Sequence, residues 1–185
     1  MYSTSGEKSK KSNNRSRMSN SNIIVISGPS GSGKTTLINR LIENHPEIVF
    51  STSHTTRAIR TNEVEGKDYY FVSREQFLAM RDRGEFAECA EVYGNYYGTS
   101  CAEIEAKSTP GGNAILALDI DVQGADQIKK KYPKALFIFI VPPSLEILKQ
   151  RLEAREKKFD RHIQKRLEIA KEELQQYMRY DYIVV

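Results

Sequence analysis

The sequence predicts an α/β fold in which helices cover both faces of a parallel β-sheet. Short apolar segments at residues 23–27, 114–120, 135–141 and 182–185 have the length and composition of buried strands. Segments with a helical pattern lie between them, at residues 35–45, 122–132 and 144–179. A glycine-rich turn joins the first strand to the first helix. Strands that alternate with helices in this way form parallel sheets with helices on both faces.

Length and composition suit one compact domain. The chain has 185 residues, of which 39% are apolar and 28% charged. The longest apolar run, residues 135–141, is far shorter than the roughly 20 residues of a membrane span. Cys89 and Cys101 form no CxxC pair, which favours reduced thiols over a zinc site or a disulfide framework. We therefore expect a soluble, cytoplasmic protein without membrane contacts.

Residues 1–22 are rich in serine, asparagine and lysine, and we expect a disordered basic tail there. This tail contains five basic residues and one acid, which together account for the whole net charge of +4. The rest of the chain is electrically balanced, so the charge does not predict nucleic-acid binding. The arginine- and serine-rich composition leaves a transit peptide as an alternative.

The middle of the chain has a different pattern from the alternating ends. Residues 48–100 contain many tyrosines, threonines and glycines, with strands expected around 68–72 and 91–97 and a helix near 74–83. This pattern predicts a small α+β lobe, at about residues 51–100, inserted into a domain that spans 23–185. The core of that domain would comprise residues 23–50 and 101–185.

A phosphate-binding loop is predicted between the first strand and the first helix. Residues 28–35, GPSGSGKT, match the pattern GxxxxGK[ST] in the required strand–turn–helix context. Glycines let successive backbone N–H groups face a phosphate, and Lys34 adds a positive charge. The alternative is a glycine-rich turn with an incidental lysine. The residues expected to bind ATP are Gly28, Ser30, Gly31, Ser32, Gly33, Lys34, Thr35 and Thr36.

A Mg²⁺ ion would accompany the nucleotide. Thr35 in the loop and Asp119 at the end of a neighbouring strand are its candidate ligands. Asp119 has an alternative interpretation as a residue that ends the strand or caps the following helix.

Several segments resemble the guanylate kinase family and occur in the family's order from about residue 23 to the end of the chain. They are ISGPSGSGKTT at 26–36, SHTTRAIR at 53–60, EVEGKDYYF at 63–71, GNYYGT at 94–99 and DIDVQG at 119–124. The resemblance implies a P-loop NTPase-type core, a lobe that binds a nucleoside monophosphate and a helical lid at about 151–166. It implies that the chain uses ATP to phosphorylate GMP, and dGMP as well.

The resemblance also implies a set of GMP-binding residues. Two arginines would hold the GMP phosphate, because a guanidinium is a planar donor that can bind it in a bidentate fashion. Glu88 would accept hydrogen bonds from N1–H and the N2 amino group of guanine. Without the resemblance, the alternative is that the two arginines belong to a solvent-exposed face and that Glu88 is a surface residue. The set is Ser53, Arg57, Arg60, Glu63, Tyr69, Glu88, Tyr97, Thr99 and Asp121.

Arginines in the lid are expected to neutralise the transferred phosphoryl group. Arg151 and Arg155 lie four residues apart on one helical face, and Arg166 follows. The predicted catalytic residues are Lys34, Arg57, Arg151, Arg155 and Arg166. Nearby glutamates make a salt-bridged exposed helix the alternative for the lid arginines. The three histidines are expected to be structural or solvated.

The sequence departs from the family pattern in a few places. The segment after Arg155 lacks a glycine and an acidic cluster, and His54 and Ile59 replace a serine and a proline. The sequence ends at Val185, before a loop and helix that are usual in the family. A protein-binding scaffold without activity is the alternative function, but such scaffolds lose the phosphate loop that Gly33, Lys34 and Thr35 form here. We expect a monomer or a homodimer.

Overall fold

Five parallel strands form the central sheet of the computed structural model, which describes residues 22–108, 113–155 and 161–185. In spatial order they are β2 (Ile48–Phe50), β7 (Ile115–Asp119), β1 (Ile23–Ser27), β8 (Leu136–Ile140) and β9 (Tyr182–Val184). Each neighbouring pair is parallel. The predicted fold class is confirmed.

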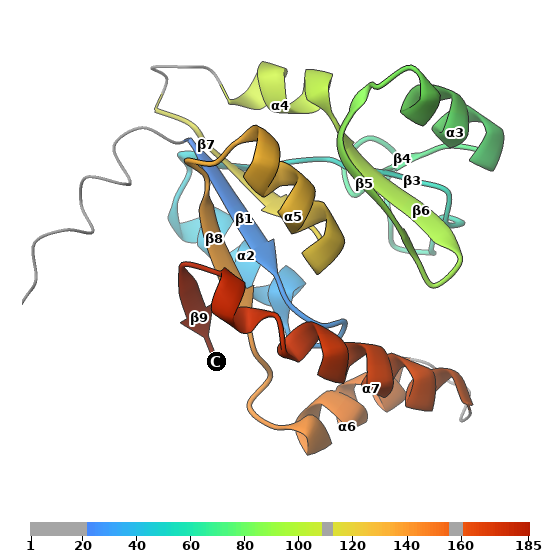
Figure 1. The fold of residues 1–185 in the computed structure, drawn as a ribbon, viewed down its shortest axis with the longest axis vertical. Helices are drawn as coiled ribbons and strands as arrows, with labels where there is room; N and C mark the ends of the chain where they lie inside the picture. Colours follow the sequence, from blue (N-terminus) through green and yellow to red (C-terminus); the bar gives the residue numbers. More distant parts are fainter. Residues whose placement is uncertain (1–21, 109–112, 156–160) are drawn as a thin grey trace, which may run out of the picture.

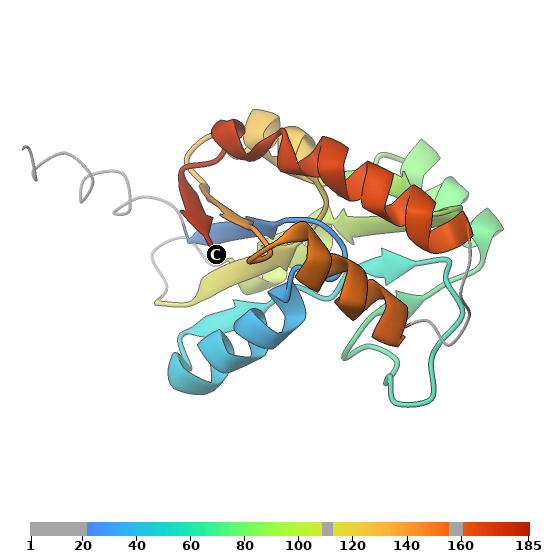
Figure 2. The same ribbon diagram turned by 90° about the horizontal axis from the view of Figure 1, so that it is seen from below.

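Helices pack on both faces of this sheet because neighbouring strand residues point in opposite directions. On one face, Ile38 of α2 (Lys34–Asn44) packs with Ile26 of β1. On the other face, Ile104 of α4 (Cys101–Lys107) and Ile128 of α5 (Val122–Lys131) pack with Val25. Figure 2 shows α2 and α5 on opposite sides of the strands.

A second, smaller sheet lies beside the first (Figure 1). Its order is β4 (Tyr70–Phe71), β3 (His54–Thr55), β6 (Asn95–Ser100) and β5 (Phe86–Val92). Helix α3 (Arg74–Asp82) begins with a capping box between Ser73 and Gln76 and packs Phe77 against Phe86, with ring centroids 4.4 Å apart. The residues between β2 and α4 thus form a body of their own.

The charged region 144–179, expected to be helical throughout, contains separate elements. Helix α6 (Leu145–Arg155) and helix α7 (Arg161–Leu174) bury Leu148, Leu152, Ile163 and Ala170 against one another. A 3-10 turn, η1 (Tyr177–Arg179), leads into β9. Residues 156–160 of the expected lid lie outside the described residues, as does the expected tail except for Asn22.

The predicted secondary structure of the middle of the chain differs from the observed one in several places, since strands β2 and β3 and most of β5 were not predicted. The segment 91–97, expected to be one strand, contains the turn between β5 and β6, where Tyr93 and Gly94 have φ values of 51° and 80°. Helix α4 had not been predicted. It starts after Ser100, whose side chain accepts a hydrogen bond from the Glu103 N–H.

None of the helices in the described ranges has both the length and the apolar character needed to cross a bilayer.

Candidate functional site

The phosphate loop connects the carboxyl end of β1 to α2, at the sheet edge where parallel α/β proteins bind ligands. Gly28, Gly31 and Gly33 have φ values of 147°, 87° and 105°, which a residue with a side chain rarely adopts. A Cβ at Gly28 would also collide with the Ile140 carbonyl oxygen. Lys34 Nζ lies inside the curl and donates to Gly28 O at 2.6 Å. The loop therefore has the cradle conformation that its sequence predicts.

Helix α6 packs directly on the phosphate loop. Leu148 and Leu152 lie under Gly31, where an added Cβ would be only 3.1 Å from Leu148 Cδ1. Arg151 Nη1 donates to Ser32 O at 2.9 Å and approaches Gly31 O at 3.4 Å. A guanidinium from the expected lid thus lies against the loop that would hold ATP phosphates.

Two side chains at this edge suit a magnesium ion. Thr35 is exposed in the first turn of α2, and Asp119 ends β7 in register with Ile26 of β1. A hydroxyl and a carboxylate are ligands that Mg²⁺ accepts when water and nucleotide phosphates complete its shell. The described residues contain no cluster of three or more potential metal-binding side chains.

The second half of the site is formed by the second sheet. Arg57 makes a bidentate pair with Glu63, with Nη1–Oε2 and Nη2–Oε1 distances of 3.0 and 2.8 Å. Burial lowers the pKa of Arg57, but the hydrogen bonds with Glu63 raise it, and the net effect is a raised pKa. The guanidinium also lies 5.4 Å from the centre of the Tyr69 ring, which is 6.0 Å from the Tyr97 ring. Arg57 is therefore held in place by one carboxylate and an aromatic wall.

Glu88 is a buried carboxylate on β5, with 3% of its surface exposed. Its Oε1 accepts a hydrogen bond from Thr99 N at 2.8 Å, and Thr99 Oγ1 lies 3.1 Å from Ser53 Oγ. Burial raises the pKa of Glu88 to about 7, the Thr99 hydrogen bond lowers it, and the nearby Asp121 raises it. The structure thus brings together Glu88, Thr99 and Ser53, three of the residues that we expected to bind GMP.

Asp121 connects the two halves of the site. Its side chain caps α5 by accepting a hydrogen bond from Gly124 N at 2.8 Å. A Cβ on Gly124 would lie 2.5 Å from Glu88 Oε2 and 3.3 Å from Asp121 Oδ1, so both carboxylates flank this glycine. Burial raises the pKa of Asp121, whereas the positive charge of Lys34 lowers it. Asp121 therefore lies near both the phosphate-loop lysine and the buried glutamate.

A similar link joins Asp119 to the second sheet. Burial raises the pKa of Tyr69 to about 12, and the Asp119 carboxylate adds to this rise. The end of β7 thus lies within electrostatic range of the aromatic wall behind Arg57.

The remaining predicted residues lie further from this centre. Arg60 is 55% exposed, and its Nη1 is 4.0 Å from Glu63 Oε1. Arg166 of α7 places its guanidinium 4.7 Å from the centre of the Tyr93 ring, at the β5–β6 turn. Arg155 ends α6, and its side chain lies outside the described part of the structure.

Two residues of this region were missed by sequence reasoning. Gly124 belongs to the segment DIDVQG but is not among the predicted site residues. A glycine inside a predicted helix is the sequence feature that could have indicated its importance. Glu173 of α7 was not considered. Burial raises its pKa to about 7, the positive charge of Lys34 lowers it and Asp121 raises it, so this carboxylate lies within electrostatic range of the phosphate-loop lysine. No local sequence signal distinguishes Glu173 from its neighbour Glu172.

Comparisons with known proteins agree with this geometry. The profile described as guanylate kinase matches residues 20–185. A guanylate kinase of Geobacter metallireducens is 48% identical over 163 residues, which cover 88% of this chain and 79% of the relative. One from Hahella chejuensis is 47% identical over 167 residues, covering 90% and 79%.

Solved structures lead to the same family. The crystal structure of guanylate kinase from Anaplasma phagocytophilum superposes with a TM-score of 0.71 at 39% identity, over 90% of this chain and 77% of that one. A phosphate-loop cradle, a buried glutamate and an arginine paired with a carboxylate thus occur in a chain whose sequence and fold both match one family. The chain belongs to the guanylate kinase family.

Proposed function

We propose that this chain transfers the γ-phosphate of ATP to GMP, and to dGMP, with GDP or dGDP and ADP as products. One observation carries the assignment: Asp121 lies near both Lys34 of the phosphate loop and the buried Glu88. A donor phosphate on the loop and an acceptor whose base reaches Glu88 would therefore share one site. Membership of the guanylate kinase family supports the same reaction.

The reaction needs little acid–base chemistry from the protein. An ionised phosphate oxygen of GMP attacks the γ-phosphorus, and the bond from that phosphorus to the β,γ-bridging oxygen breaks. Charge builds up on the transferred group, so catalysis consists of alignment and charge neutralisation. In our proposal Lys34, Arg57, Arg151, Arg155 and Arg166 supply the positive charge.

The ATP side of the proposal uses the phosphate loop. Its backbone N–H groups and Lys34 would bind the phosphates, and the contact of Lys34 with Gly28 O would be exchanged for phosphate oxygens. Thr35 and Asp119 would hold Mg²⁺, which neutralises phosphate charge when it is bound. The position of Arg151 against Ser32 O supports a role for α6 next to these phosphates.

The GMP side uses the second sheet. The GMP phosphate would be bound by Arg57, whose guanidinium Glu63 orients, and by the more exposed Arg60. Tyr69 and Tyr97 would contribute hydroxyl groups. Glu88 would accept from both N1–H and the N2 amino group of guanine. Adenine presents an acceptor at N1 and lacks that amino group. A buried carboxylate left without donors is costly, so the site would reject adenine by roughly 10⁴-fold.

The domain division belongs to this proposal. The core would comprise residues 23–50 and 101–185, the GMP-binding lobe about 51–100 and the lid about 151–166. The two unpaired cysteines suit a reducing cytoplasm, and a monomer or homodimer would suffice because the described site residues come from one chain. The scaffold alternative lacks support, since Lys34 lies within an intact phosphate cradle.

A coupled assay of ADP release tests the function. We expect turnover with GMP and dGMP, and little with AMP or UMP. Lys34→Ala should abolish turnover, because the phosphate charge loses its principal partner. Glu88→Gln should weaken the preference for GMP, whereas Glu91→Gln, at an exposed position of the same strand, should behave like the native protein. Preference for AMP in the native chain would refute the assignment.

A further inference from the structure

The strand that carries Glu88 contains a β-bulge immediately before it. Phe86 pairs with Ser100 and Glu88 pairs with Thr99, so Ala87 is an extra residue on β5. Bulges next to functional sites re-aim the neighbouring side chain. The direction of the Glu88 carboxylate therefore depends on how the bulged segment, Phe86–Cys89, is held.

This segment lies on the outer edge of its sheet, because β5 is the last strand in the order β4-β3-β6-β5. An outer edge leaves backbone N–H and C=O groups without strand partners. At Cys89 both groups are taken by one side chain of α5. Gln127 Oε1 accepts from Cys89 N at 3.1 Å, and Gln127 Nε2 donates to Cys89 O at 2.8 Å.

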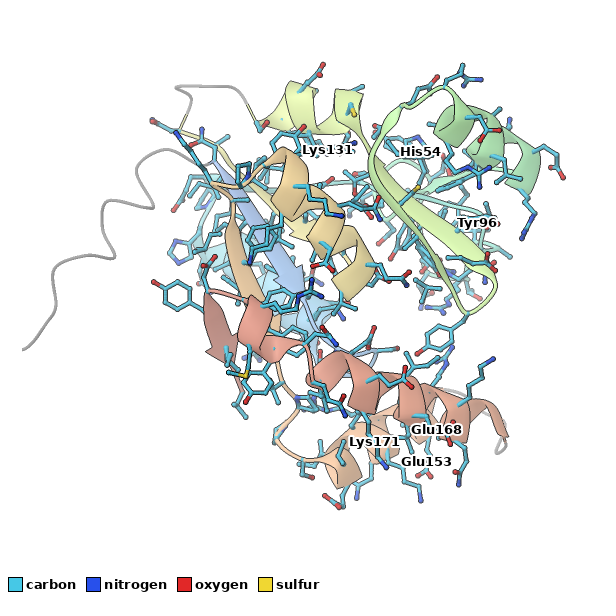
Figure 3. The ribbon with its side chains drawn as sticks, viewed as in Figure 1. His54, Tyr96, Lys131, Glu153, Glu168 and Lys171 are labelled. Carbon is cyan, nitrogen blue, oxygen red and sulfur yellow. The ribbon has the colours of Figure 1, made fainter. Side chains whose placement is uncertain are left out.

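A second side chain of α5 holds the other end of the bulge. Lys131, labelled in Figure 3, extends from the end of α5 and donates from Nζ to Phe86 O at 2.9 Å. Gln127 and Lys131 are four residues apart and so lie on one face of the helix. Their contacts bracket Glu88, while Gly124, one turn earlier, touches its carboxylate.

We propose that Gln127 and Lys131 are positioning residues that fix the bulged segment Phe86–Cys89 on α5 and thereby set the preference for guanine. This inference rests on the proposed role of Glu88 in binding the base. Of the uncharged side chains of this length, an amide supplies both the acceptor for Cys89 N–H and the donor for Cys89 C=O. The contacts act on Glu88 through the backbone, so neither residue needs to touch the nucleotide.

The test compares GMP with IMP, whose base keeps N1–H but lacks the 2-amino group. We expect Gln127→Met to reduce the ratio of kcat/KM for GMP to kcat/KM for IMP by about tenfold, the factor for one misaligned charge-assisted hydrogen bond. The KM for ATP should not change. Lys131→Met should reduce the ratio in the same direction, and Lys131→Arg should restore it. Lys130→Met, on the exposed face of α5, is the matched control and should leave the ratio unchanged.

A purely structural role predicts a different outcome. If Gln127→Met and Lys131→Met lower kcat/KM for GMP and IMP in equal proportion, the positioning role is wrong. If Gln127→Met does not fold, the comparison of Lys131→Met with Lys130→Met decides by the same ratio. A native chain that phosphorylates GMP and IMP equally well would instead refute the guanine-reading role of Glu88. A native chain without GMP turnover would refute the proposed function, and this inference with it.

Discussion

At the scale of single residues, Gly124 shows how a missing side chain shapes the site. A glycine inside a helix costs about 1 kcal/mol relative to alanine, so its presence requires a reason. The reason here is space, because a Cβ would lie 2.5 Å from Glu88 Oε2. Glu88 is pinned from its other side by Thr99 N–H and cannot retreat without losing that bond.

We therefore expect Gly124→Ala to separate stability from activity. The thermal midpoint should change little or fall slightly, because the helix preference of alanine, about 1 kcal/mol, offsets part of the cost of displacing Glu88 from its hydrogen bond with Thr99 N. The value of kcat/KM for GMP should fall by about 100-fold, because a carboxylate displaced by about 1 Å no longer meets its donors. Lys130→Ala on the same helix serves as the control. Steady-state kinetics that match the native protein would show that Glu88 does not need its present position.

At the scale of elements, α7 links the two halves of the molecule. Near its middle, Arg166 places its guanidinium over the Tyr93 ring at the turn between β5 and β6. Near its end, Glu173 lies within electrostatic range of Lys34, and Figure 1 shows the helix extending between these regions. A buried carboxylate at the end of α7 makes the packing of this helix dependent on pH.

The sign of this dependence follows from the raised pKa of Glu173. Its folded value of about 7 lies above the ordinary 4.5, so the folded state binds the proton more tightly than the unfolded state. The resulting stability is complete below about pH 4.5 and is lost as the pH rises through 7. The free energy of unfolding can be measured with urea at pH 5 and pH 8 for the native chain and for Glu173→Gln. The difference between variant and native chain should favour the variant more at pH 8 than at pH 5, by on the order of 2 kcal/mol. Glu172→Gln, at an exposed neighbouring position, should show no such gain, and an equal gain in both variants would contradict the assignment.

Local patterns were sufficient to predict some elements and insufficient for others. The β1–α2 unit was predictable because an apolar strand, a glycine turn and a helical pattern follow each other directly. The β5–β6 turn was missed although Gly94 and Asn95 are typical turn residues, because the segment 91–97 also has the composition of a strand and Tyr93 is unusual at a positive φ. Helix α4 has only seven residues and depends on burying Ile104. Such a short helix is set by its packing and leaves little periodicity to detect.

The same limit applies to the site. Lys34 and Arg57 could be proposed because each lies in a recognisable motif, and Glu88 because the family resemblance implies its role. Gln127 and Glu173 could not, since their importance depends on which elements pack together. Gln127 matters because α5 covers the edge of β5, and Glu173 because the end of α7 reaches Lys34. Neither contact is encoded within one segment of sequence.

At the scale of the whole molecule, the carboxyl edge of the parallel sheet faces the second sheet. Asp121, the N-cap of α5, lies within electrostatic range of Lys34 and close to Glu88. Asp119, at the end of β7, lies within electrostatic range of Tyr69. The short connection from β7 to α5 therefore links the two halves of the site. Separate, unconnected sites for the two nucleotides would have placed these groups apart. The arrangement instead suits direct transfer between two bound nucleotides.

A competition experiment tests this claim most directly. ATP labelled at the γ-phosphate is supplied in limiting amount to the native protein with equal concentrations of GMP and AMP, and the labelled diphosphates are separated. We expect nearly all transferred label to appear in GDP and none to be transferred by Lys34→Ala. Label distributed equally between GDP and ADP, or released mainly as inorganic phosphate, would contradict this claim.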